Sequence, residues 1–210
     1  MKTFMKFLAG FLGSFFKKGP ITEKVPKVKK PAKPVQEPFE VIDYVNVLKW
    51  HKSRTWSKRT LSKINKLVVH QSLTSGSLEG INNYHITPGK QNHISPKGAP
   101  HICYHYAVDK DGKVYQCNQH SSLVWHTRGQ NTTGIGIVLL GNFDGPTYKG
   151  TETPTSLQLE NTNRLIDFLL KSKDINIEKT EVYGHKDFGK ENCPGTIVYD
   201  SVVKLRREGK

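Results

Sequence analysis

Two apolar runs of strand length place the strongest constraint on the fold of this 210-residue chain. Residues 66–72 read KLVVHQS, and residues 133–143 read TGIGIVLLGNF. A short apolar run bounded by polar residues is typical of a buried strand. The glycines of the second run indicate where a neighbouring backbone comes close. We therefore expect both runs to be strands of a sheet, with His70 ending the first one, where its side chain can reach a cleft.

Signals for both helices and strands follow along the chain. Residues 101–117 hold two β-rich segments around Lys110-Asp111-Gly112, a sequence typical of a hairpin turn. Residues 153–173 predict a helix with Thr153 as its N-cap and Pro154 at its first position. The remaining elements are a helical or irregular lead-in at 39–66, a helix at 77–86, a strand at 181–185 and a helix at 196–209. This order, without an internal repeat, predicts an α/β fold with a single mixed β-sheet flanked by helices.

The first 18 residues have the pattern of an amphipathic helix. Large apolar side chains follow i, i+3, i+4, i+7 spacing at Phe4, Phe7, Leu8, Phe11, Leu12 and Phe15. The run is too short to span a bilayer, which needs about 20 apolar residues. It is followed directly by Lys17-Lys18, without a clear cleavage site. We predict that residues 1–18 lie on an anionic membrane surface. An export signal and a helix docked on the main domain are the alternatives.

Positive charge is concentrated near the N-terminus. The chain carries a net charge of +14, and residues 1–36 hold nine lysines against one acid, Glu23. Residues 19–38 contain five prolines and five lysines, which is typical of an extended, semi-rigid linker. Such an arm suits an anionic partner, or it only solubilises the chain. No nucleic-acid-binding motif accompanies the charge, so we expect no nucleic acid partner. From residue 39 the composition becomes globular, which predicts one domain over 39–210.

One cysteine and two histidines form a candidate metal site. His70 ends a strand, His185 follows the strand-like EVYG, and Cys193 comes eight residues later. Two imidazoles and a thiolate make a three-ligand set for zinc that leaves the fourth position to water. The spacing alone is weak evidence, because a lone cysteine before a proline is more often a small buried apolar residue.

Four segments occur in a recognisable order between about Leu61 and Val203. They are VVHQS at 68–72, GAPHICYHYAVDKDGKVYQC at 98–117, WHTRGQNTTGIGIVLLGNF at 125–143 and GHKDFGKENCPG at 184–195. Together they resemble the zinc-dependent N-acetylmuramoyl-L-alanine amidases, the type 2 amidase family. This family includes phage lysozymes of the T7 kind and animal peptidoglycan-recognition proteins.

The resemblance implies a metal site and a reaction. One zinc ion would be bound by His70, His185 and Cys193. A water activated by this zinc would cleave the amide between N-acetylmuramic acid and L-alanine. Tyr104 matches a family tyrosine whose hydroxyl stabilises the developing charge. The alternative for Tyr104 is a strand residue that anchors the sheet.

Other matched positions are less clear. His126 matches a residue that lines the substrate groove, whereas Asn131 either contacts substrate or stabilises a turn. Many family members place a lysine or threonine where this chain has Glu191, next to Lys190. Glu191 is expected to act as a general base or to be a solvated loop acid, and Lys190 is the candidate replacement for the missing lysine. Val138 occupies a position where some members have a catalytic glutamate, which places the chain with the T7-like branch.

The resemblance leaves the biological setting open. We expect a peptidoglycan hydrolase that acts as a monomer, most simply a phage endolysin that lyses its host. Such a protein is made in the bacterial cytoplasm and acts at the peptidoglycan of the periplasm or cell wall. The alternatives are a non-catalytic peptidoglycan-binding module of the same fold and a bacterial wall-remodelling amidase.

Overall fold

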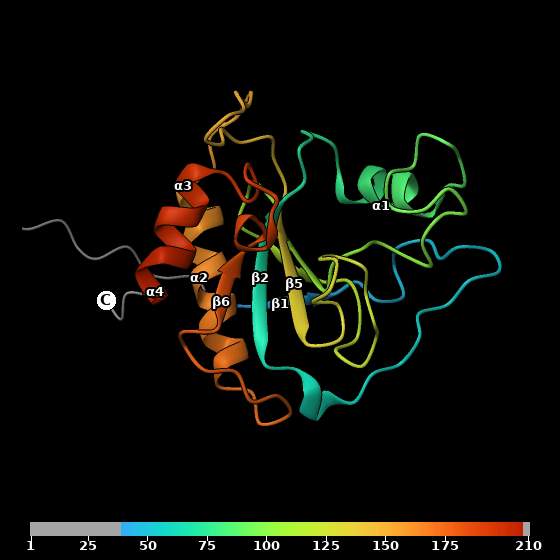
Figure 1. Ribbon diagram of the computed structural model, residues 1–210, viewed down its shortest axis with the longest axis horizontal. Helices are drawn as coiled ribbons and strands as arrows, with labels where there is room; N and C mark the ends of the chain where they lie inside the picture. Colours follow the sequence, from blue (N-terminus) through green and yellow to red (C-terminus); the bar gives the residue numbers. More distant parts are fainter. Residues whose placement is uncertain (1–38, 208–210) are drawn as a thin grey trace, which may run out of the picture. The chain divides into compact units, whose positions relative to one another are not determined.

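The computed structural model of the protein describes residues 39–207 (Figure 1). The predicted amphipathic helix at 1–18 and the linker at 19–38 lie outside the described residues, so both stay predictions. Within 39–207, no helix is both long enough and apolar enough to cross a membrane.

A six-stranded mixed sheet forms the centre of the described part, as predicted. Its strand order is β1-β4-β3-β5-β2-β6. Neighbouring strands run parallel except for β3 and β4, which form the predicted antiparallel hairpin. The strands are β1 (Val41–Asp43), β2 (Lys66–Gln71), β3 (Tyr106–Val108), β4 (Val114–Gln116), β5 (Gly134–Leu139) and β6 (Val182–Gly184).

The two apolar runs of the sequence lie side by side in the middle of this sheet. All six residues of β5 are buried, as are the last five of β2. The two strands pair in parallel, with His70 opposite Val138. Strand β6 pairs in parallel with the other side of β2, so the carboxyl termini of β5, β2 and β6 lie at the same end of the sheet. His70 therefore lies beside the segment that follows β6.

Helices cover both faces of the sheet. The long helix α2 and the C-terminal helices lie on one face, and α1 lies on the other (Figure 1). Residues Leu165, Ile166 and Leu169 of α2 join the main core cluster with Leu67 and Val69. A second cluster joins Leu78 and Ile81 of α1 to Val138 of β5 and Ala107 of β3. The helices are α1 (Leu78–Ile86), α2 (Ser156–Leu170), α3 (Thr196–Val198) and α4 (Leu205–Arg207), with a π-helix at Tyr199–Lys204 and short 3-10 helices at Leu61–Lys63 and His185–Phe188.

Two predicted details are wrong. The lead-in contains an edge strand, β1, which pairs in parallel with β4. The N-cap of α2 is Thr155 and not Thr153, because the Thr155 hydroxyl accepts a hydrogen bond from the backbone N–H of Gln158. The Gln158 side chain in turn accepts a bond from the Thr155 N–H, which completes a capping box.

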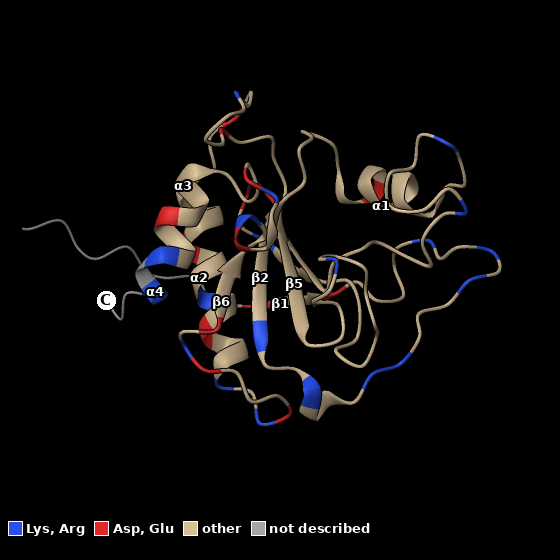
Figure 2. Cartoon of the chain, in the orientation of Figure 1, with Lys and Arg blue, Asp and Glu red and all other residues tan. Residues whose placement is uncertain are grey.

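Basic residues in the described part are spread over several elements (Figure 2). They include Lys66 at the start of β2 and Arg206 and Arg207 on α4. Arg59, in the lead-in, is 7% exposed and donates hydrogen bonds to the backbone carbonyls of His120, Asn131 and Gly134. This buried guanidinium therefore ties the lead-in to the loop before β5.

Candidate metal centre

The three predicted metal ligands come together at the carboxyl-terminal ends of β2 and β6. His70 is the fifth residue of β2, and His185 directly follows β6. Their Nδ1 atoms are 3.1 Å apart, and the Cys193 Sγ atom is 3.9 Å from His70 Nδ1. The donor atoms of all three residues lie within 4.8 Å of one another. The sequence therefore folds so that two nitrogens and one sulfur face a common point.

The two separations measured from His70 Nδ1 are close to those of a single tetrahedral ion, and the donor atoms of His185 and Cys193 lie within 4.8 Å of each other. Two nitrogens that each lie about 2.0–2.1 Å from one zinc are about 3.3 Å apart, and a sulfur at about 2.3 Å is about 3.5 Å from each nitrogen. The observed separations of 3.1 and 3.9 Å are within a few tenths of an ångström of these values. The donor set of two imidazoles and one thiol is also the kind that binds zinc.

Burial shapes the protonation of the three ligands. It lowers the pKa of His70 well below its usual value, and the neighbouring His185 adds to this effect. Burial lowers the pKa of His185 to about 4, with a further contribution from the charge of Lys190. Both imidazoles are therefore neutral at pH 7, which is the form that binds metals. Burial raises the pKa of the Cys193 thiol to about 12, so a bound metal ion has to displace its proton.

Gln71 fixes the position of Cys193. Its backbone N–H donates a hydrogen bond to the Cys193 sulfur, with the two atoms 3.4 Å apart. Its side-chain amide donates to the carbonyls of Asn192 and Phe143 and accepts from the Phe143 N–H. One buried side chain thus joins β2 to the loop that carries the cysteine. Nothing in the sequence singled out Gln71, because its partners lie far away along the chain.

Tyr104 lies beside the three ligands. Its ring centroid is 5.2 Å from that of His70 and 5.8 Å from that of His85 on α1. Burial raises the pKa of its hydroxyl far above the usual value, and the Cys193 thiolate would add to this effect. The phenol therefore stays protonated at neutral pH and can act as a hydrogen-bond donor.

Lys190 and Glu191 are both exposed and differ in their surroundings. The Lys190 charge acts on the centre, because it lowers the pKa values of both His185 and Cys193. The Glu191 carboxylate accepts a hydrogen bond from the Thr147 hydroxyl over 3.4 Å. Of these two neighbours, the lysine is the one whose charge reaches the metal ligands.

His126 and Asn131 occupy supporting positions. The sequence placed His126 in a substrate groove, yet its side chain is 6% exposed and both of its ring nitrogens contact protein atoms. Asn131 accepts a hydrogen bond from the backbone N–H of Thr127 over 2.8 Å, which is the turn-stabilising geometry considered for it. Thr127, which the sequence did not single out, contacts both His126 and His70.

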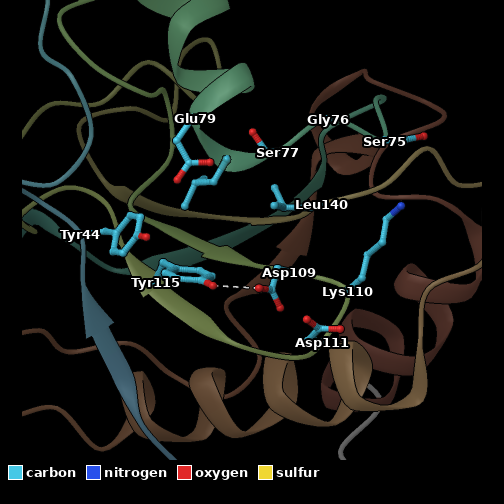
Figure 3. A pocket seen from close by; sticks show the side chains of 11 residues that line it. Tyr44, Ser75, Gly76, Ser77, Glu79, Asp109, Lys110, Asp111, Tyr115 and Leu140 are labelled. Atoms are coloured by element: carbon cyan, nitrogen blue, oxygen red, sulfur yellow. Dashed lines mark hydrogen bonds between the residues drawn. The ribbon is translucent and has the colours of Figure 1, made fainter.

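A separate pocket lies on the α1 side of the sheet and contains none of the three ligands (Figure 3). It has a volume of about 420 Å³ and lies between the start of α1 and the β3–β4 turn. Its walls include Glu79, Asp109 and Asp111 and the rings of Tyr44 and Tyr115. The Asp109 carboxylate already accepts bonds from the Tyr115 hydroxyl and the Lys113 N–H. Asp109 therefore serves the hairpin turn itself.

Comparison with known proteins defines the class of the chain. Residues 60–196 match the type 2 amidase family, described as "N-acetylmuramoyl-L-alanine amidase". The chain belongs to this family, and the match includes every residue of the candidate centre.

Individual relatives are distant. Peptidoglycan-recognition protein SC2 of Drosophila simulans is 28% identical over 110 residues, which are 52% of this chain and 56% of that protein. The chain thus spans little more than half the length of this curated relative. Among solved structures, peptidoglycan recognition protein LE in complex with tracheal cytotoxin superposes with a TM-score of 0.63 at 19% identity, over 80% of this chain and 94% of that chain. The endolysin amidase LysCS from Clostridium intestinale gives 0.51 at 23% identity, over 77% and 93%. These similarities confirm the predicted fold.

Proposed function

We propose that the protein is a zinc-dependent N-acetylmuramoyl-L-alanine amidase, which hydrolyses the amide between the lactyl group of N-acetylmuramic acid and L-alanine in peptidoglycan. The observation that carries the proposal is the convergence of His70, His185 and Cys193, with Tyr104 beside them, in a chain of this family. A bound zinc ion would supply a water of lowered pKa and would polarise the amide carbonyl.

The residues of the chain prepare the site for this chemistry. Burial keeps the imidazoles of His70 and His185 neutral, so their lone pairs are free to bind the ion at pH 7. Gln71 holds the sulfur of Cys193 in place through its backbone N–H. A donor set that is already positioned reduces the reorganisation needed for binding and catalysis.

Tyr104 supplies a neutral donor beside the residues that would hold the ion. As the amide carbon becomes tetrahedral, negative charge develops on the carbonyl oxygen. The protonated phenol of Tyr104 donates a hydrogen bond to this oxygen. Lys190 adds a positive charge from the rim of the site, whereas Glu191 is directed toward Thr147. We therefore assign the assisting charge to Lys190 and treat Glu191 as a solvated loop residue.

A binding module of the same fold is the competing function. Curated relatives include peptidoglycan-recognition proteins, and one structural neighbour is a complex with monomeric diaminopimelic acid-type peptidoglycan. The retained thiol of Cys193 favours the enzyme, because binding alone does not require a complete metal site. Similarity to an endolysin supports a role in host lysis, with action at the peptidoglycan of the periplasm or cell wall.

Removal and return of the metal test this proposal. The full chain is stripped with a chelator, reloaded with zinc, and incubated with purified sacculi while their turbidity is followed. We expect no clearing by the stripped protein and full recovery at one zinc ion per chain. Equal clearing by the stripped and reloaded proteins would contradict a zinc-dependent amidase. Binding of sacculi without clearing by the reloaded protein would establish the binding module instead.

A further inference from the structure

The ring of His126 lies flat against two glycines of β5. A Cβ atom on Gly136 would approach the Cγ atom of His126 to 2.6 Å and its Nδ1 atom to 2.9 Å. A Cβ atom on Gly134 would come within 3.0 Å of Cε1 of the same ring. The contact at Gly136 is too close for a side chain, whereas a side chain at Gly134 would require the ring to shift by a few tenths of an ångström. The Gly-x-Gly spacing puts both vacant positions on one face of the strand.

That face also carries His70 on the adjacent strand. Gly136 pairs with Val68 and Val138 pairs with His70, so the His126 ring reaches the His70 side chain across β5 and β2. His126 Nδ1 is 3.3 Å from His70 Nε2, the ring nitrogen that points away from the metal centre. The hydroxyl of Thr127 is also 3.3 Å from His70 Nε2 and is 2.9 Å from His126 Nδ1.

One assignment of protons gives a hydrogen-bond partner to each of His70, His126 and Thr127. His126 Nε2 lies 3.1 Å from the carbonyl of Gly134, which can only accept, so Nε2 carries the proton. His126 Nδ1 must then accept, and its shortest contact is the Thr127 hydroxyl. The Thr127 oxygen in turn accepts from Nε2–H of His70. With its proton on Nε2, His70 presents the lone pair of Nδ1 toward His185 and Cys193, as metal binding requires.

We propose that His126 and Thr127 are positioning residues that hold His70 in its Nε2–H tautomer, and that Gly134 and Gly136 form the seat for the His126 ring. A metal-bound histidine ordinarily donates its other N–H to an acceptor, and loss of that acceptor costs about 10–100-fold in metal affinity. Here the acceptor is the Thr127 hydroxyl, which is oriented by His126 and, through it, by the Gly134 carbonyl. The inference rests on the proposed metal site but not on the reaction that this site performs.

Two measurements on the full chain test this inference. The first is the ¹⁵N spectrum of the histidine rings in metal-free protein, which reports which nitrogen of His70 is protonated. We expect the Nε2–H tautomer in the wild type and a mixture of tautomers in His126→Ala. A wild-type His70 protonated at Nδ1 would overturn the inference, whatever the protein does with zinc. An Nε2–H tautomer in a wild type that binds no zinc would support the inference and contradict the proposed function.

The second measurement is the zinc affinity, obtained by competition with a chromophoric chelator. We expect His126→Ala and Gly136→Ala each to weaken zinc binding about 10–100-fold. We expect His126→Asn to recover much of the loss, because its amide oxygen can replace Nδ1 as the acceptor. Gly89→Ala is the matched control, since a Cβ atom there meets nothing within 4 Å.

A double-mutant cycle separates positioning from general packing. A Cβ atom on Gly136 would also approach the Cβ atom of His126 to 2.9 Å, so the cycle uses His126→Gly, which removes the whole side chain. If Gly136 acts through His126, Gly136→Ala costs little further zinc affinity in a His126→Gly background. Circular dichroism and thermal unfolding show which variants are folded at the temperature of the titration. Folded His126→Ala protein that binds zinc within about twofold of the wild type would overturn the proposal, as would fully additive effects of the two substitutions.

Discussion

The backbone N–H of Gln71 donates a hydrogen bond to the sulfur of Cys193, although the two residues are 122 positions apart in the chain. The side chain of Gln71 completes the connection by bonding to the carbonyls of Asn192 and Phe143 and to the Phe143 N–H. The third candidate ligand is therefore positioned by a residue on the same strand as the first. We therefore expect the stability of the loop and the affinity for a metal ion both to depend on Gln71.

Replacement of Gln71 by alanine tests that coupling. The change leaves three buried backbone groups without their partner, so we expect a loss of about 2–3 kcal/mol in the free energy of unfolding. Zinc affinity should fall as well, because the cysteine loop loses its tether. Urea unfolding of the metal-free protein and chelator competition measure the two effects. The exposed Gln119→Ala is the control and should change the stability by less than about 0.5 kcal/mol. An unchanged zinc affinity in Gln71→Ala would show that the loop holds Cys193 without the side-chain amide of Gln71.

Tyr104→Phe removes the proposed donor and leaves the ring. We expect kcat on sacculi to fall about 10²–10³-fold, as for the loss of one donor to a developing oxyanion. Zinc content should stay at one per chain, since Tyr104 is not among the three ligands. Activity and metal content are measured on the same preparation. A variant with full activity would assign Tyr104 to anchoring the sheet.

Lys190 and Glu191 are distinguished by neutral replacements. We expect Lys190→Met to lower kcat about tenfold, which corresponds to about 1.4 kcal/mol of transition-state stabilisation. Glu191→Gln should stay within about twofold of the wild type, because this carboxylate faces Thr147. Initial rates are compared at equal zinc occupancy. The opposite ranking would identify Glu191 as a general base and contradict our assignment.

Acid should destabilise the fold through buried histidines, of which His85 is a clear case. Burial lowers the pKa of His85 to about 4, and its Nδ1 accepts a bond from the Cys103 N–H. The unfolded chain takes up this proton near pH 6.5, and the folded protein does so only near pH 4. Stability from His85 is therefore complete above about pH 7 and is lost as pH falls from 6.5 to 4, by about 2 kcal/mol at pH 5.

His85→Asn isolates this contribution, because the asparagine oxygen keeps an acceptor for Cys103 and does not titrate. Denaturant unfolding at pH 8 and pH 5 should show a smaller acid-induced loss in the variant, by about 2 kcal/mol. Identical pH profiles for the wild type and His85→Asn would contradict the role given to His85.

The sequence predicts those parts of the fold whose signals are local. The strands β2 and β5 are continuous apolar runs, and the β3–β4 turn contains Asp111-Gly112. These elements can therefore be assigned without knowing which other segments of the chain they contact. The edge strand β1 was missed because its three residues are only partly covered and carry no periodic pattern. The start of α2 was misplaced by two residues, since Thr153 and Thr155 are equally good N-caps until Gln158 selects between them.

The residues of the candidate site also fall into those that local sequence predicts and those that it does not. Its three ligands could be proposed from the sequence because each stands in a recognisable segment. The supporting residues could not, because Gln71 and Thr127 act through bonds to atoms far away along the chain. His126 shows the limit most clearly. Its segment predicted a residue of the substrate groove. In the structure its ring is buried, because it packs over Gly134 and Gly136 of β5, next to His70.

Analysis of the products released from purified sacculi tests the central claim most directly. The zinc-loaded wild type is compared with Cys193→Ala, and Cys117→Ala serves as the control because it removes a buried thiol away from the three ligands. We predict that the wild type and Cys117→Ala release stem peptides with new L-alanine amino termini, and that Cys193→Ala releases none. Release of reducing sugars instead of amino termini, or an undiminished yield of L-alanine termini from Cys193→Ala, would contradict the account.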